Sequence, residues 1–169
     1  MAKKEKTLAD LFHETLKDIY YAEKKILTTL PKMAKAAQSD DLQAAFKKHE
    51  SETKGQVERL ERVFALLEEP AKGKTCDAVN GIIKEGQEII AEFKGTAALD
   101  AGLLAAAQAV EHYEISRYGT LKTWAEQLGL PEAVTLLDQT LEEERKTDEA
   151  LTELAEAAVN QEAQPVAAE

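Results

Sequence analysis

Hydrophobic residues recur every three or four positions along most of the chain, which is the period of an amphipathic α-helix. Pro, Gly and clusters of small polar residues interrupt this pattern and divide it into separate segments. Strong helix formers (Ala, Leu, Glu and Lys) dominate the segments, and β-branched residues are sparse. The pattern therefore predicts an all-α protein with helices over about residues 8–37, 40–69, 76–93, 97–128 and 131–160.

Two connections between long helices are short, one near Ser39 and the other near Leu130. Helices joined by such short links pack as antiparallel hairpins, whereas the second and third long helices are joined by a long connection that contains the short helix. Two hairpins with one long crossover are typical of a ferritin-like four-helix bundle, which is the fold class that we predict. We expect one domain over residues 1–160 and a flexible tail over residues 161–169, and Pro31 predicts a kink or local unwinding of the first helix.

The net charge of −11, from 21 basic and 32 acidic residues, narrows the range of partners. An acidic surface repels nucleic acids and anionic membranes and attracts cations, so we expect no nucleic acid and no membrane as partners. No apolar run approaches the roughly 20 residues that span a bilayer, and the charged N-terminal segment lacks the apolar stretch of a signal peptide. The single cysteine, Cys76, excludes a disulfide within the chain. These features predict a cytoplasmic protein.

Acidic residues and one histidine interrupt the hydrophobic stripes near the middle of each long helix. Residues three or four positions apart share one helix face, so same-helix pairs of these residues face the same way. Glu23 lies 16 residues before Ser39, and Glu144 lies 14 residues after Leu130. At a rise of about 1.5 Å per residue, such offsets agree within roughly one turn, which places the whole set at mid-height in the bundle. The set consists of Glu23, His49, Glu52, Glu111, Glu114, Glu144 and Asp148.

So many inward-facing acids require a positive partner. A buried carboxylate without a partner is costly, and several of them together repel one another. The inward stripes contain no Lys or Arg at this level. Two divalent cations would supply four positive charges, and carboxylates with an imidazole suit iron or manganese, with zinc as a substitute. We therefore predict a two-metal centre, with iron as the first candidate. Taken alone, the pair Glu111/Glu114 or the pair Glu144/Asp148 is better explained as solvated residues at the rim of the bundle.

Other polar residues near the acids admit two interpretations each. Tyr20, Tyr113 and Tyr118 either pack in the core or donate hydrogen bonds to ligand carboxylates. Cys76 is either a reactive thiol at the start of a helix or a small, partly buried residue.

Several segments of the chain together resemble a known family. They include Asp18-Ile19-Tyr20-Tyr21-Ala22-Glu23-Lys24, His49-Glu50-Ser51-Glu52-Thr53, Gly73-Lys74-Thr75-Cys76, Val110-Glu111-His112-Tyr113-Glu114 and Leu141-Glu142-Glu143-Glu144. In these segments the sequence resembles the YciE/YciF family of bacterial stress-associated proteins, and the resemblance implies a ferritin-like fold and a homodimer. Ferritins and rubrerythrins use Glu-x-x-His, whereas here His49 precedes Glu52 and Glu144 is followed by Thr147. This departure leaves three alternatives: the site holds metal in an altered geometry, holds it weakly, or holds none.

Two hypotheses about function follow from these observations. In the first, the protein is a di-iron or di-manganese carboxylate protein with a redox role in stress, and an open coordination position binds oxygen or peroxide. Glu23 and Glu144 would each hold one metal, Glu52 and Glu111 would bridge or chelate, and the rest of the set would complete the coordination shells. In the second, the protein is a non-enzymatic helical homodimer that serves as a structural or partner-binding module, and the acids lie in a hydrated cavity.

Overall fold

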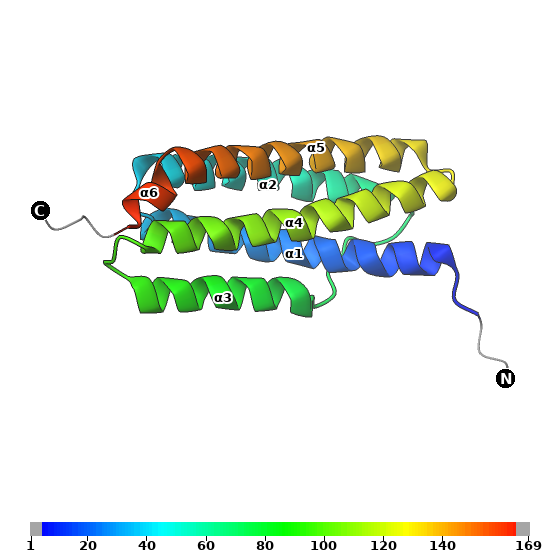
Figure 1. Cartoon of the computed structure of the whole chain (residues 1–169). Coiled ribbons are helices and arrows are strands. Elements are labelled where there is room, and N and C mark those ends of the chain that lie inside the picture. Colours follow the sequence, from blue (N-terminus) through cyan, green and yellow to red (C-terminus); the bar gives the residue numbers. More distant parts are fainter. Residues whose placement is uncertain (1–4, 165–169) are drawn as a thin grey trace, which may run out of the picture.

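The computed structural model describes residues 5–164, and every regular element within them is a helix, so the all-α prediction is confirmed. Four long helices lie side by side (Figure 1): α1 (Leu8–Ala36), α2 (Asp40–Leu66), α4 (Leu99–Gln127) and α5 (Pro131–Leu154). The shorter α3 (Asp77–Phe93) packs on the outside of this bundle against α1 and α4.

The four long helices form a closed ring, because α1 packs on α2 and α4, and α5 packs on the same two helices, α2 and α4. Chain neighbours α1 and α2, and likewise α4 and α5, run in opposite directions (Figure 1). Helices α2 and α4 run in the same direction, so the chain must return along the whole bundle between them. Helix α3 makes this return.

Polar contacts hold the ends of the helices. Thr7 caps α1 in a capping box, in which the Asp10 N–H donates to the Thr7 hydroxyl (3.3 Å) and the Asp10 carboxylate accepts from the Thr7 N–H (2.8 Å). The Asp100 carboxylate accepts from the N–H groups of Gln38 (2.8 Å) and Ser39 (2.6 Å). Asp100 thereby fixes the α1–α2 turn against the start of α4.

The crossover before α3 is anchored on α1. The N–H of Lys74 donates to the carbonyl of Lys17 at 3.0 Å, using a lone pair that the helix leaves available. Gly73 lies so close to α1 that a Cβ added there would come 3.3 Å from the Cα of Tyr21. The absence of a side chain at Gly73 therefore lets the crossover lie flat on the helix.

Some helix boundaries differ from those predicted. Helix α1 continues through Pro31 without the predicted unwinding, because Pro31 lies on the exposed side, where water can reach the carbonyl that loses its donor. Helix α2 ends three residues before the predicted boundary, since Glu68 adopts a left-handed φ of 55°. After α5, a π-helical turn (Ala155–Val159) leads into α6 (Asn160–Glu162), so helical structure extends slightly into the predicted tail. Residues 165–169 of that tail lie outside the described residues.

Two apolar layers enclose a polar middle layer. At the end of the bundle near the start of α1, the buried side chains include Phe12, Leu16, Phe64, Leu121 and Leu137. At the opposite end they include Met33, Leu42, Leu103, Leu104 and Leu151. Each such side chain contributes about 1.5–3 kcal/mol when it is fully buried, so these layers can offset the cost of polar groups between them. Within residues 5–164, no helix combines the length and the apolar character needed to cross a membrane.

Candidate metal centre

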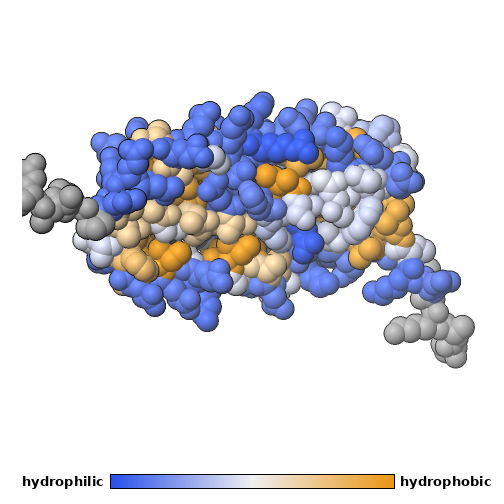
Figure 2. Space-filling view, viewed as in Figure 1, coloured by the Kyte–Doolittle hydropathy of each residue, from blue (hydrophilic) through white to orange (hydrophobic). Residues whose placement is uncertain are grey.

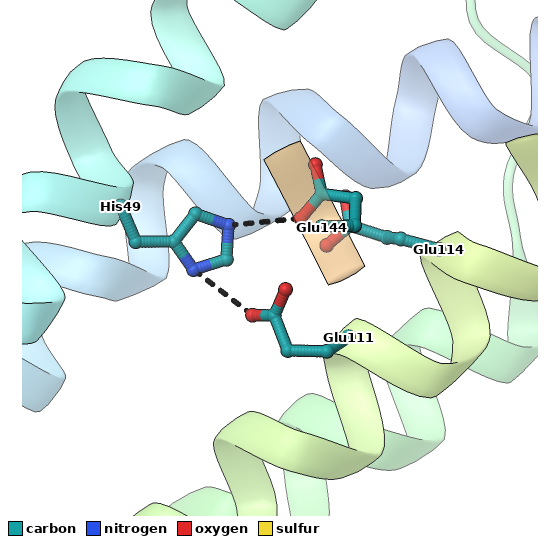
Figure 3. A group of neighbouring side chains, drawn as sticks. All are labelled: His49, Glu111, Glu114 and Glu144. Carbon is teal, nitrogen blue, oxygen red and sulfur yellow. Dashed lines mark ion pairs between the residues drawn. The ribbon is translucent and has the colours of Figure 1, made fainter. Parts of the chain in front are cut away.

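Four buried side chains from three helices meet in the middle of the bundle (Figure 3). They are His49 of α2, Glu111 and Glu114 of α4, and Glu144 of α5, and one ligand atom from each lies within 4.8 Å of the others. His49 is 3% exposed and the three glutamates are completely buried. The site is therefore a buried cluster of donors of the kinds that bind metals.

The helical pattern places these residues on the bundle axis. Glu111 and Glu114 are three positions apart, so they lie on one face of α4. That face also carries the buried Leu104 and Tyr118, which pack in the bundle interior. The same holds for Glu144, which lies three positions after the buried Leu141 on α5. Burial of the apolar residues therefore brings the acids inside with them.

The imidazole of His49 lies between carboxylates from two helices (Figure 3). Its Nδ1 is 3.0 Å from Oε1 of Glu111, and its Nε2 is 3.7 Å from Oε2 of Glu144. The first contact lacks hydrogen-bond alignment and the second is too long for a hydrogen bond, so both are electrostatic contacts. One ring nitrogen of His49 thus points toward each of the two neighbouring carboxylates.

Glu23 is the contribution of α1, and it lies beside this group. Its side chain is completely buried, and the hydroxyl of Tyr118 donates a hydrogen bond to one of its carboxylate oxygens. Of the three tyrosines considered from the sequence, Tyr118 is the one that reaches a predicted ligand. The hydroxyl of Tyr20 instead donates to Glu61 at 2.9 Å, and that of Tyr113 donates to Asp18 at 3.1 Å.

The acids of this layer hold their protons unusually tightly. Burial raises the pKa of Glu23 to about 7, against the opposing effect of the Tyr118 hydrogen bond. Burial likewise raises the pKa of Glu111 to about 8. The pKa values of Glu114 and Glu144 lie well above their usual range, because burial and the neighbouring carboxylates both disfavour the charged form. Without cations, these four groups therefore resist simultaneous ionisation.

Unpaired polar atoms show that the donor set fits cations. Among the described residues, no hydrogen-bond partner exists for either carboxylate oxygen of Glu111, Glu114 or Glu144. One carboxylate oxygen of Glu23 and Nε2 of His49 also lack a hydrogen-bond partner among these residues. A buried polar atom without a partner costs about 1–3 kcal/mol, so a cation that contacts several of these atoms removes several such costs at once. Carboxylates with one imidazole suit iron, manganese or zinc.

Two of the seven predicted ligands, Glu52 and Asp148, lie at the edge of the group rather than on the axis. Glu52 is half-buried, with Nζ of Lys48 3.3 Å from its carboxylate. Asp148 accepts a hydrogen bond from Nε2 of Gln108 (3.3 Å) and contacts Nε2 of His112 (3.2 Å). Both carboxylates are still near enough to add to the raised pKa of Glu111, whose main cause is burial. Their role as ligands stays a prediction.

The sequence interpretation missed one positive charge near the acids. Arg59 of α2 forms an ion pair with Glu143, and its Nε donates to the hydroxyl of Thr140 at 2.9 Å. While burial raises the pKa of Glu23, the charge of Arg59 acts in the opposite direction. Arg59 follows the buried Gln56 by three positions, and this spacing was the available signal that it points toward the bundle.

Cys76 is a buried helix cap rather than an exposed thiol. Its Sγ accepts from the N–H of Val79 at 3.4 Å and lies 3.2 Å from the hydroxyl of Tyr113. Of the two interpretations from the sequence, the structure agrees with the small buried residue.

Comparisons with known proteins find relatives that span nearly the whole chain. Residues 7–164 match the family model described as Domain of unknown function (DUF892). Protein YciF of Escherichia coli K12 is 46% identical over 160 residues, which cover 94% of this chain and 96% of YciF. The crystal structure of that stress protein superposes with a TM-score of 0.88 over 93% of this chain and 99% of its own. YcfI of Rhodopseudomonas palustris, described as a candidate structural protein, is 43% identical, with a TM-score of 0.86 over 90% of this chain and 97% of its own.

Proposed function

The chain belongs to the DUF892 family, as its resemblance to YciE/YciF proteins predicted, and on that premise we propose that it is a stress protein with a two-metal carboxylate centre. The centre lies in the polar middle layer and takes iron or manganese, with zinc as a substitute. One observation carries the proposal: the buried, unpaired carboxylate oxygens of Glu111, Glu114 and Glu144 surround His49.

Charge balance supports two ions rather than one. The four completely buried glutamates carry four negative charges when they are ionised. Two divalent ions neutralise this charge, whereas one leaves two negative charges in a dry interior, where an uncompensated charge is very costly. Glu52 and Asp148 at the edge of the layer complete the coordination shells.

Each residue of the chain has a defined part in such a centre. Glu23 of α1 and Glu144 of α5 come from opposite sides of the ring and would each hold one ion, and Glu111 of α4 would bridge or chelate. The hydroxyl of Tyr118 orients the Glu23 carboxylate. The apolar layers above and below exclude water. Bound iron or manganese would supply redox chemistry with oxygen or peroxide.

We also propose that the chain acts as a homodimer, because its resemblance to the YciE/YciF family implies one. Sedimentation equilibrium of the untagged protein should give twice the mass of the chain, and a monomer over the whole micromolar range would contradict this proposal.

A second candidate function is purely structural. One feature favours it: burial raises the pKa values of Glu111 and Glu144, so the interior favours the protonated form of both acids. Protonated carboxyl groups can hydrogen-bond to each other and need no cation. The description of the Rhodopseudomonas relative as a candidate structural protein is in line with this alternative.

Metal analysis of untagged protein separates the two functions. The first predicts close to two equivalents of iron or manganese per chain after anaerobic loading and gel filtration, whereas the second predicts none. The change Glu144→Gln should weaken metal binding by at least about tenfold, since even the loss of a residue that only hydrogen-bonds to a ligand lowers metal affinity about 10–100-fold. The matched control is Glu142→Gln, because Glu142 is an exposed residue of the same helix that pairs only with Arg145 among the described residues. Equal affinity of both variants, or no loading at all, would contradict the metal centre.

A further inference from the structure

A pocket of about 320 Å³ lies between α1, α3 and α4 and reaches the candidate metal centre. His49 and Glu111 form part of its lining. Its volume falls within the range of roughly 300–1,000 Å³ that is usual for small-molecule sites. The polar middle layer is therefore reached from the surface through a space large enough for an organic molecule.

The walls of the pocket are aliphatic along most of its depth. They include Ile26, Leu30, Met33, Ile83, Ile90 and Val110. The polar residues of its lining are Thr29, Lys32, His49, Gln87 and Glu111. At the outer end, Lys32 of α1 and Gln87 of α3 are exposed, which places the mouth between these helices. At the inner end lie the buried His49 and Glu111, whose Nε2 and carboxylate oxygens are buried and lack hydrogen-bond partners among the described residues.

Small residues create the space. Gly86 of α3 faces Ala106 of α4, and a Cβ at Gly86 would come 3.5 Å from the Cβ of Ala106. Ala107 lines the pocket one position further along α4. Larger residues at these positions would fill the space beneath α3. Figure 2 shows apolar side chains gathered over the seam between α3 and α4, so this side of the pocket is closed by apolar material.

We propose that this pocket binds an aliphatic molecule with a small, uncharged, oxygen-bearing end, the class that contains alkyl alcohols and alkyl hydroperoxides. The chain lies along the aliphatic walls, and the oxygen-bearing end reaches His49 and Glu111. A charged carboxylate end is disfavoured, because the floor of the pocket already holds a dense group of acids. Along the aliphatic part of the pocket water is a poor occupant, because these walls offer it no hydrogen bonds. The role of this molecule as a substrate of the metal centre rests on the proposed function, but its binding does not.

Calorimetric titration with 1-octanol and with octanoate tests the proposal, using chelator-treated and manganese-loaded protein. We expect 1-octanol to bind the chelator-treated protein at least about tenfold more tightly than octanoate does. Burial of each methylene is worth about 0.8 kcal/mol, so affinity should rise about fourfold per carbon from 1-hexanol to 1-octanol.

Two variants of α3 locate the binding site. Gly86→Leu fills the pocket and should weaken 1-octanol binding at least about tenfold. Gly81→Leu is the matched control, since it makes the same change in the same helix at an exposed glycine with nothing within 4 Å of an added Cβ. If Gly86→Leu fails to fold by circular dichroism, Ile83→Gln replaces it, because a polar amide on the half-buried wall should lower affinity severalfold.

The outcomes separate this proposal from the metal centre. Binding of 1-octanol that Gly86→Leu removes, in protein that takes up no metal, supports the pocket and refutes the proposed function. Uptake of metal without 1-octanol binding, or equal binding by both glycine variants, overturns the pocket. A dimer that Gly86→Leu dissociates, with no alcohol binding, also overturns it, because the mouth would then be covered by a second copy of the chain.

Discussion

Tyr118 and Glu23 show how one buried polar residue lowers the energetic cost of burying another. Both side chains are completely buried, and the tyrosine hydroxyl donates to the carboxylate. The sequence indicated that a tyrosine lay near the acids, but three tyrosines met that condition. Which tyrosine reaches a predicted ligand depends on how the helices are rotated against one another, and this rotation is set by side-chain packing rather than by spacing along the chain.

The change Tyr118→Phe should destabilise the metal-free protein by about 1–3 kcal/mol, because the Glu23 carboxylate then loses its hydrogen-bond donor in a dry interior. Urea unfolding monitored by circular dichroism measures this loss. Tyr20→Phe is the control: its hydroxyl donates to the exposed Glu61, which water can solvate instead, so we expect a loss of only about 0.5–1.5 kcal/mol. A smaller loss for Tyr118→Phe than for Tyr20→Phe would show that the buried hydrogen bond contributes nothing.

At the scale of elements, α3 docks on α4 through one glycine. A Cβ at Gly102 would come 2.6 Å from Cγ2 of Ile89, a distance that forces a shift. Ile89 is β-branched and has few rotamers available in a helix, so it cannot move aside easily. The close approach of the two helices therefore depends on the missing side chain at Gly102.

Replacing this glycine by alanine should destabilise the protein even though alanine is the better helix former. Gly102→Ala gains about 1 kcal/mol of helix propensity but costs about 1–3 kcal/mol through overpacking against Ile89. The control Gly119→Ala lies in the same helix, with nothing within 4 Å of the added Cβ. It should therefore gain the helix propensity of roughly 1 kcal/mol without any cost from overpacking. Thermal unfolding of the two variants should therefore move the melting temperature in opposite directions, and parallel increases would contradict the docking role.

The existence of each helix was predictable, whereas some ends were not. The hydrophobic period identified all five main helices, because burial of one face decides whether a segment is helical. The end of α2 depends on one residue with a left-handed backbone conformation, Glu68. Glycine or asparagine usually occupies such a position, so a glutamate there gives no signal in the sequence. The π-helical turn Ala155–Val159 adds one residue to a helical turn, and a stretch of alanines carries no signal for such an addition.

At the scale of the whole molecule, distances along the two hairpins were sufficient to place acids from all four helices in one layer. They could not decide which member of a same-helix pair faces the axis. His49 and Glu52 are three positions apart, so they differ by about 60° around the helix, and a small rotation of α2 exchanges them. In the structure, His49 faces the bundle axis and Glu52 lies at the edge of the polar layer.

The raised pKa values predict an unusual dependence of stability on pH. In the metal-free protein, Glu23, Glu111, Glu114 and Glu144 face one another and His49, and burial raises the pKa of each glutamate above its ordinary value of 4.5. Between about pH 5 and about pH 8 the folded state then binds more protons than the unfolded state, so stability falls as pH rises. Metal binding requires deprotonated ligands, so stabilisation by metal should grow over the same range.

Melting curves recorded across this range, with chelator and with manganese, measure both trends. Glu114→Gln serves as the matched variant, because it removes one buried acid and should make the metal-free dependence shallower. Stability of the chelated protein that rises with pH would show that these carboxyl groups titrate normally.

The anchored crossover has a consequence for how two copies of the chain can associate. Proteins made of two hairpins can exchange one hairpin between copies when the segment joining them swings free. Here that segment is tied to its own α1 by the hydrogen bond from Lys74 to Lys17, and Gly73 lies flat against the same helix. Each chain is therefore able to complete its own bundle, and we expect the proposed homodimer to consist of intact bundles that meet at their surfaces rather than of swapped halves.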